Sequence, residues 1–83
     1  MKIIWDESKR LANLDKHGLD FCVVTLDFFM SARVVPAKLG RYKAIGRVGE
    51  ATVVAIFAPL GREALSLVSL RRANTKERRA YGD

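Results

Sequence analysis

The 83-residue sequence contains one cysteine and one histidine, and each scarcity excludes a class of protein. Cys22 has no second cysteine to pair with, so the chain is not a disulfide-stapled secreted scaffold, and a cytoplasmic location is expected. One cysteine and one histidine cannot supply a four-ligand zinc site without an unusual set of carboxylates. We therefore expect no metal and no other cofactor.

Long apolar runs are also missing. The longest apolar-rich stretch, residues 21–30, is interrupted by Thr25 and Asp27 and is far shorter than the ~20 residues of a membrane span. Residues 1–6 lack the apolar core of a secretory signal. The hydrophobic fraction of 49% and the charged fraction of 29% are typical of a globular chain. The sequence thus predicts one soluble domain, residues 1–83, that does not associate with membranes.

Negative charge is scarce in the second part of the chain. Residues 1–32 contain four Lys or Arg against five Asp or Glu, whereas residues 33–83 contain eleven against four, so the net charge of +6 arises after residue 32. Arginine predominates there, and its planar guanidinium suits phosphate. This distribution is typical of a protein that binds nucleic acid or an acidic partner. The alternative is a solvated face that only keeps a small protein soluble.

Local patterns predict a strand and two helices in the first part of the chain. Residues 2–5 are short and apolar, as in a strand. Asp6 is a good N-cap for a helix over 7–16, which Gly18 would end. Asp20 can cap a second helix that reaches about residue 30. Residues 23–25 would also suit a strand, but the length of the segment and the single face shared by its apolar residues favour the helix.

After residue 32 the pattern changes to that of strands. We expect strands at 33–36, 41–48, 52–58 and 63–70, with a turn at 59–61. Gly46 and Gly49 are interpreted as turn or bulge residues. Asn74 and Glu77 have the spacing of a capping box for a last helix, 75–81.

These elements predict an α+β fold. It comprises a short N-terminal strand, two helices, a three- to four-stranded antiparallel sheet and a C-terminal helix, with the helices on one face of the sheet. In the strand 41–48, Arg41, Lys43 and Arg47 share one side. We expect that side to be a basic surface exposed to solvent.

Short motifs in both halves of the chain occur in an order and spacing that are specific for so short a sequence. They are Trp5-Asp6-Glu7, Lys9, Asn13, Lys16-His17-Gly18 and Phe21 in the first half, and Arg41 to Gly46, Leu67-Val68-Ser69, Arg71-Arg72-Ala73, Glu77-Arg78 and Tyr81 in the second. Together they resemble the BrnT family, toxins of type II toxin–antitoxin modules. Ser66 departs from the pattern, because many members carry arginine there. If that arginine contacts RNA in other members, the contact is either missing here or made by a neighbouring residue such as Arg62 or Arg71.

The resemblance implies a RelE-like fold and a ribonuclease activity that arrests translation. It also implies a cognate BrnA-like antitoxin that neutralises the toxin and binds operator DNA as a complex with it. Two alternatives fit the same basic chain: a nucleic-acid-binding module without catalysis, and a basic protein that docks an acidic partner.

RNA cleavage without a metal needs a group that removes the 2′-hydroxyl proton and cations that stabilise the charged phosphate. We expect Arg62, Arg71 and Arg79 to be the phosphate ligands, which requires that they converge on one exposed patch. His17, Glu63 and Tyr81 are the candidates for proton transfer. His17 could instead bond the last carbonyls of the first helix, and Glu63 could simply pair with Arg62.

Further basic and aromatic side chains are candidates for binding RNA outside the reacting centre. They are Arg41, Lys43, Arg47, Arg72, Lys76 and Tyr81. Tyr81 could stack on a base or, alternatively, hold the last helix against the sheet.

Overall fold

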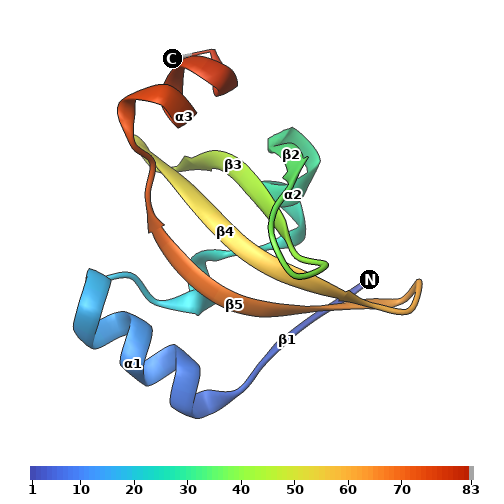
Figure 1. Ribbon diagram of the computed structural model, residues 1–83. Helices are drawn as coiled ribbons and strands as arrows, with labels where there is room; N and C mark the ends of the chain where they lie inside the picture. The colour runs from blue at the N-terminus through green and yellow to red at the C-terminus, as the bar shows by residue number, and fades with distance from the viewer. Residues whose placement is uncertain (83) are drawn as a thin grey trace.

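Five strands form one mixed sheet in the computed structural model, which describes residues 1–82 (Figure 1). The elements in chain order are β1 (Lys2–Trp5), α1 (Glu7–His17), the 3-10 helix η1 (Phe21–Val23), α2 (Leu26–Ser31), β2 (Arg33–Pro36), β3 (Tyr42–Val48), β4 (Ala51–Leu60), β5 (Ala64–Arg72) and α3 (Thr75–Tyr81). The strand order is β1-β5-β4-β3-β2. β2 to β5 are antiparallel, and β1 adds a parallel fifth strand beside β5. The α+β class is confirmed, and the sheet is larger than predicted because the N-terminal strand joins it.

Local capping residues set the limits of α1 as the sequence predicts. The Asp6 side chain accepts a hydrogen bond of 2.9 Å from the backbone N–H of Ser8, and bonds from Ser8 lower the pKa of this carboxyl. At the other end, Gly18 has a φ of 69° and its N–H donates to the carbonyl of Leu14. Glycine adopts this left-handed conformation without steric cost, so the helix ends there.

The prediction of one helix from Asp20 to about residue 30 is wrong. Asp20 caps only the single turn of η1, and Val24 then has extended backbone. Thr25 caps the separate helix α2 by accepting a hydrogen bond of 3.3 Å from the N–H of Phe28. Three consecutive β-branched residues, Val23 to Thr25, disfavour a continuous helix, and the threonine hydroxyl offers a new start.

The turn between β4 and β5 lies later than predicted. Pro59 and Leu60 continue β4, opposite Leu65 and Ala64, and the turn comprises residues 61–63. Gly61 supplies the positive φ, 64°, that the turn needs. Arg62 and Glu63 therefore lie at the tip of a hairpin rather than at the start of a strand.

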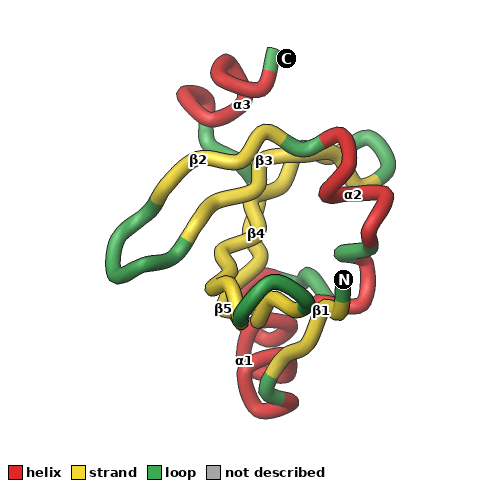
Figure 2. Tube along the Cα trace, turned by 90° about the vertical axis from the view of Figure 1, so that its right-hand side faces the viewer, coloured by secondary structure: helices red, strands yellow, loops and turns green. Residues whose placement is uncertain are grey.

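Helices cover parts of both faces of the sheet, so the prediction that they lie on one face is wrong. One core lies beneath η1 and α2, where Phe21 and Phe28 contact sheet residues such as Leu67. A second, smaller core lies beneath α3, around Ile45 and Val54. Figure 2 shows α3 and α1 at opposite ends of the molecule. None of the helices in residues 1–82 combines the length and apolar character needed to cross a membrane.

Gly46 is neither a turn nor a bulge residue, contrary to the prediction. It lies within β3 opposite Val53, and a Cβ atom there would come within 2.8 Å of the Phe28 ring and 3.3 Å of the Ala32 Cβ. The missing side chain lets α2 approach β3 closely. Gly49, in contrast, does lie in the β3–β4 turn, with a φ of 60°.

Candidate functional site

Asn13 attaches α1 to the edge of β5. β1 pairs with β5 only as far as Leu67, so the backbone of Leu70 has no strand partner on that side. The side-chain amide of Asn13 takes the place of a neighbouring strand. Its Nδ2 donates to the Leu70 carbonyl and its Oδ1 accepts from the Leu70 N–H, both at 2.9 Å. Nδ2 also donates to the Leu19 carbonyl at 2.9 Å, and the Ser69 hydroxyl donates to Oδ1 at 3.4 Å. Asn13 is only 6% exposed, so these bonds are shielded from water.

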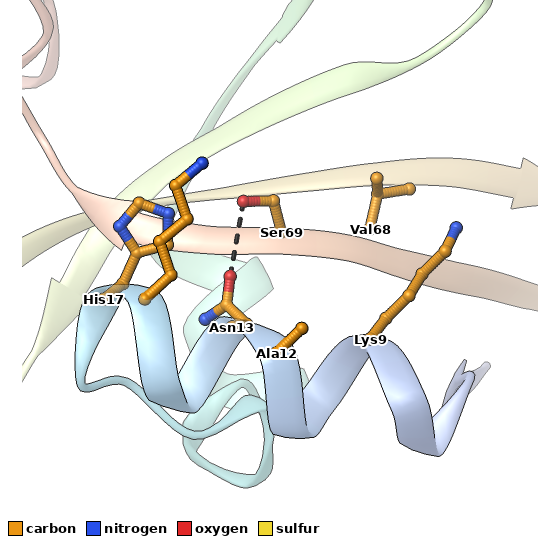
Figure 3. A pocket seen from close by; sticks show the side chains of 7 residues that line it. Lys9, Ala12, Asn13, His17, Val68 and Ser69 are labelled. Atoms are coloured by element: carbon orange, nitrogen blue, oxygen red, sulfur yellow. Dashed lines mark hydrogen bonds between the residues drawn. The ribbon is translucent and has the colours of Figure 1, made fainter.

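An open cavity of about 220 Å³ lies between α1 and β5, next to this attachment (Figure 3). It is lined by Lys9, Ala12, Asn13, Lys16, His17, Val68 and Ser69, and we call it the α1–β5 groove. Helical spacing places Lys9, Asn13 and His17 on one face of α1. Three of the seven lining residues are basic and none is acidic. The groove therefore suits an anionic ligand.

The imidazole of His17 belongs to this groove. His17 is the last residue of α1 and is partly buried. Within residues 1–82 its imidazole makes no hydrogen bond, and the carbonyl of Leu14 accepts from the Gly18 N–H instead. The imidazole therefore does not cap α1, which was the alternative role for His17. Both ring nitrogens are available to a ligand.

A buried carboxylate lies beyond the groove, at the end of β5. Glu77 of α3 is 6% exposed and accepts two hydrogen bonds from Arg71, Nη1 to Oε1 at 2.8 Å and Nη2 to Oε2 at 2.9 Å. Lys43 Nζ lies 3.2 Å from Oε2, and the N–H of Asn74 donates to Oε1 at 3.0 Å. We call Lys43, Arg71 and Glu77 the Glu77 cluster. Lys43 thus faces a carboxylate instead of open solvent, because α3 returns over that face of the sheet.

Electrostatics keep Glu77 ionised. The hydrogen bonds from Arg71 are the main cause that lowers the pKa of Glu77 to about 2, with help from the Asn74 N–H and Lys43. Glu77 in turn raises the pKa of Arg71. A carboxylate that is charged at neutral pH and whose oxygens are occupied is poorly suited to accept a proton from a substrate. It is well suited to hold the Arg71 guanidinium in a fixed orientation.

β5 connects the groove to the Glu77 cluster. Ser69 and Arg71 are two residues apart on this strand, so their side chains leave the same face, roughly 7 Å apart. A guanidinium has five N–H donors. Arg71 uses two with Glu77 and a weak third, at 3.4 Å, with the Arg72 carbonyl, which leaves donors for a phosphate. Because the groove and the cluster share this face of β5, we consider them together as the candidate site.

Arg62 and Glu63 lie far from this site. Both are exposed in the β4–β5 turn, at the opposite end of β5 from Arg71. The nine residues of β5 span roughly 30 Å. The prediction that Arg62 converges with Arg71 is therefore wrong, because nearly the whole length of β5 separates the two side chains. Ser66, the position noted above as a departure from the resemblance, is partly buried within β5, between this turn and the groove.

Other predicted ligands lie on α3. Arg79 is exposed and follows Glu77 by two residues, so its side chain leaves a different side of the helix. Lys76 is exposed as well. Tyr81 packs against the core around Ile45, which agrees with its alternative role of holding α3 to the sheet.

The remaining basic candidates are dispersed. Arg41 precedes β3 and is partly buried, whereas Arg47 is exposed near the end of β3 and donates to the Glu50 carbonyl at 3.2 Å. Arg72 follows Arg71 on β5 and points to the opposite face. Within residues 1–82, no three His, Cys, Asp or Glu side chains gather where they could bind a metal ion.

Comparison with known proteins assigns the chain to a family. Residues 5–77 match the family model described as the ribonuclease toxin BrnT of type II toxin–antitoxin systems. The chain belongs to the BrnT family. A crystal structure of the Brucella abortus ribonuclease toxin BrnT is 51% identical, with a TM-score of 0.85 over 90% of this chain and 99% of that one. A search of curated proteins found no match. The motif-based prediction of BrnT is thus confirmed, and membership implies a ribonuclease activity in general terms.

Lys9, Lys16 and Ser69 belong to the motifs that resemble BrnT, but the sequence did not identify them as residues of the candidate site. The regular spacing of Lys9, Asn13 and His17 along one helix was the available signal. It did not show that β5 lies opposite, because the bond between Asn13 and Leu70 joins residues 57 positions apart.

Proposed function

We propose that this BrnT-family chain is a metal-independent endoribonuclease that cleaves RNA, inhibits translation and is neutralised by a BrnA-like antitoxin. One observation carries the proposal: His17 and Ser69 line the same groove, and Arg71, two residues beyond Ser69 on β5, is oriented by the buried carboxylate of Glu77. A relationship to RelE-like toxins and a cytoplasmic location belong to the same proposal.

The proposed reaction uses the 2′-hydroxyl of the RNA as the nucleophile. His17 takes its proton as the 2′-oxygen bonds to phosphorus, and the imidazolium returns that proton to the departing 5′-oxygen. The products are a 2′,3′-cyclic phosphate and a free 5′-hydroxyl. Arg71 stabilises the additional negative charge on the phosphate. Glu77 is a positioning residue, since it acts only through Arg71.

The test is RNA cleavage by the purified protein in excess EDTA. We expect cleavage to continue, to leave 2′,3′-cyclic phosphate ends, and to fall by about 10²–10⁴ in His17→Ala. Unfolding curves of the variant serve as the control for its fold. Cleavage that stops in EDTA, or that survives unchanged in His17→Ala, would contradict the proposal. Salt-sensitive binding without cleavage would instead identify a non-catalytic nucleic-acid-binding module.

The proposed antitoxin needs a surface of its own on the toxin. Large apolar side chains are exposed on α2 and β2, namely Leu26, Met30 and Val34, and Met30 is 84% exposed. Contiguous exposed apolar side chains are typical of protein–protein contacts. We expect Met30→Asp to weaken binding of the antitoxin, and Leu60→Asp, at the far end of β4, to leave it unchanged. Binding of operator DNA would then require the complex rather than the toxin alone.

A further inference from the structure

We propose that the α1–β5 groove contains a second phosphate subsite of the RNA, in which Lys9 and Lys16 bind a phosphodiester adjacent to the one that is cleaved. The inference rests on the proposed function and extends it, because these lysines position the strand and take no part in the chemistry.

The length of the groove exceeds what one phosphate needs. Lys9 and His17 are eight residues apart on α1, which corresponds to about 12 Å along the helix axis. Arg71 lies beyond Ser69 on β5, outside the lining of the groove, so a cleaved phosphate held between His17 and Arg71 leaves the stretch from Lys16 to Lys9 free. Figure 3 shows Lys9 beside Val68 and His17 on the side of Ser69, so the groove runs along the edge of β5. An RNA strand that follows this edge would place another phosphate beside the lysines.

The lysines are not neutralised by the protein itself. Within the part of the chain that the structure describes, the side chains of Lys9 and Lys16 form neither an ion pair nor a hydrogen bond. Acidic side chains at the start of α1 are already hydrogen-bonded, Asp6 to Ser8 and Glu7 to Arg10, and the charge of Lys9 makes only a smaller contribution to lowering the pKa of Asp6. The positive charge of the groove therefore remains available to an anion.

The lining also favours a nucleic-acid strand over a small free anion. Ala12 and Val68 supply apolar surface between the cations, and the hydroxyl of Ser69 lies among them. Sugars and bases present apolar surface between successive phosphates, and single-stranded nucleic acids bind to grooves that combine positive charge with such surface. Inorganic phosphate would use the charge and leave the apolar surface exposed. RNA is therefore the ligand class that fits the whole groove.

The experiment measures binding of a 2′-O-methyl oligonucleotide, which lacks the nucleophile and cannot be cleaved. The variants are Lys9→Gln, Lys16→Gln and the double variant, with Lys38→Gln in the β2–β3 turn as a matched exposed control. Each lost phosphate contact lowers the slope of log K against log salt by about 0.7 for a single strand. We expect a reduction of about 0.7 in the double variant if both lysines bind one phosphate, with affinity roughly tenfold weaker at low salt. Lys38→Gln should match the wild type.

Cleavage kinetics and a phosphate titration complete the test. In the double variant KM for RNA should rise roughly tenfold while kcat stays within about threefold, as expected for binding residues. Unchanged affinity and salt slope would overturn the subsite, and so would a fall in kcat with KM unchanged. Inorganic phosphate that binds at the lysines as tightly as the oligonucleotide would also overturn it. If the protein binds RNA through these lysines but never cleaves it, the nuclease proposal fails and the binding groove stands.

Discussion

The side-chain amide of Asn13 forms two hydrogen bonds of 2.9 Å with the backbone of Leu70, and thereby completes the edge of β5 where β1 has ended. α1 has little other buried surface with which to hold its place, because Asn13 is its only buried residue. The orientation of Lys9 and His17 relative to β5 therefore depends mainly on Asn13, since the ion pair between Arg10 and Asp20 joins α1 to η1 and not to β5.

Asn13→Ala should destabilise the protein by about 2–4 kcal/mol. The substitution leaves the buried N–H and carbonyl of Leu70 without partners, and each unsatisfied group costs about 1–3 kcal/mol, partly offset by the higher helix propensity of alanine. Urea unfolding measures the change. Asp15→Ala, at an exposed position of the same helix, is the control and should change the free energy of unfolding by less than about 0.5 kcal/mol. Equal effects of the two substitutions would contradict this view of Asn13.

Glu77 should make the stability depend on pH in the acidic range. Its pKa of about 2 in the folded protein lies below the ordinary value of 4.5, so the unfolded chain takes up the proton first as the pH falls. The stabilisation is complete above about pH 5 and is lost between about pH 4.5 and pH 2. Glu77→Gln should therefore lower the free energy of unfolding by about 3 kcal/mol at pH 7 and far less near pH 2.

Chemical unfolding of the wild type and Glu77→Gln at several pH values checks this expectation. Glu50→Gln, in the exposed β3–β4 turn, is the matched control and should follow the wild type at every pH. A constant difference between the wild type and Glu77→Gln from pH 7 to pH 2 would show that the ionised cluster does not stabilise the fold.

Arg71 and Arg62, at opposite ends of β5, should differ sharply in RNA cleavage. Arg71→Ala removes the oriented phosphate ligand and should lower kcat by about 10²–10³. Arg71→Lys should also lose most activity, because lysine cannot form the paired bonds with Glu77. Arg62→Ala, in the distant turn, should stay within about threefold of the wild type. Single-turnover cleavage at saturating protein measures all three, and equal losses at both ends would place the reaction elsewhere.

The elements that depend on neighbouring residues could be predicted from the sequence. Asp6 and Gly18 delimit α1, and Asn74 with Glu77 forms the expected capping box. These contacts join residues that are at most four positions apart, so the local sequence is sufficient to predict them. The BrnT family could be predicted as well, since its motifs are short and ordered along the chain.

The assembly of the site could not be predicted, because it depends on contacts across the sheet. Leu11 and Leu14 have the spacing of a buried helix face, yet they are 52% and 38% exposed. The buried position is Asn13, whose partner Leu70 is fixed only when β5 takes its place in the sheet. Similarly, Arg62 flanks the same strand as the residues of the site, but strand length rather than sequence proximity decides which side chains meet.

Gly46 tests how closely α2 and β3 pack. A Cβ atom at this position would lie 2.8 Å from the Phe28 ring, which is 5% exposed and in edge-to-face contact with Phe29 at 5.4 Å. Gly46→Ala should therefore destabilise the protein by about 1–3 kcal/mol through overpacking. In a Phe28→Leu background the same substitution should cost less, because the smaller side chain leaves room. Urea unfolding of the four proteins of this double-mutant cycle gives the coupling energy, and a cost of Gly46→Ala that is the same in both backgrounds would show that the ring is not what excludes a side chain there.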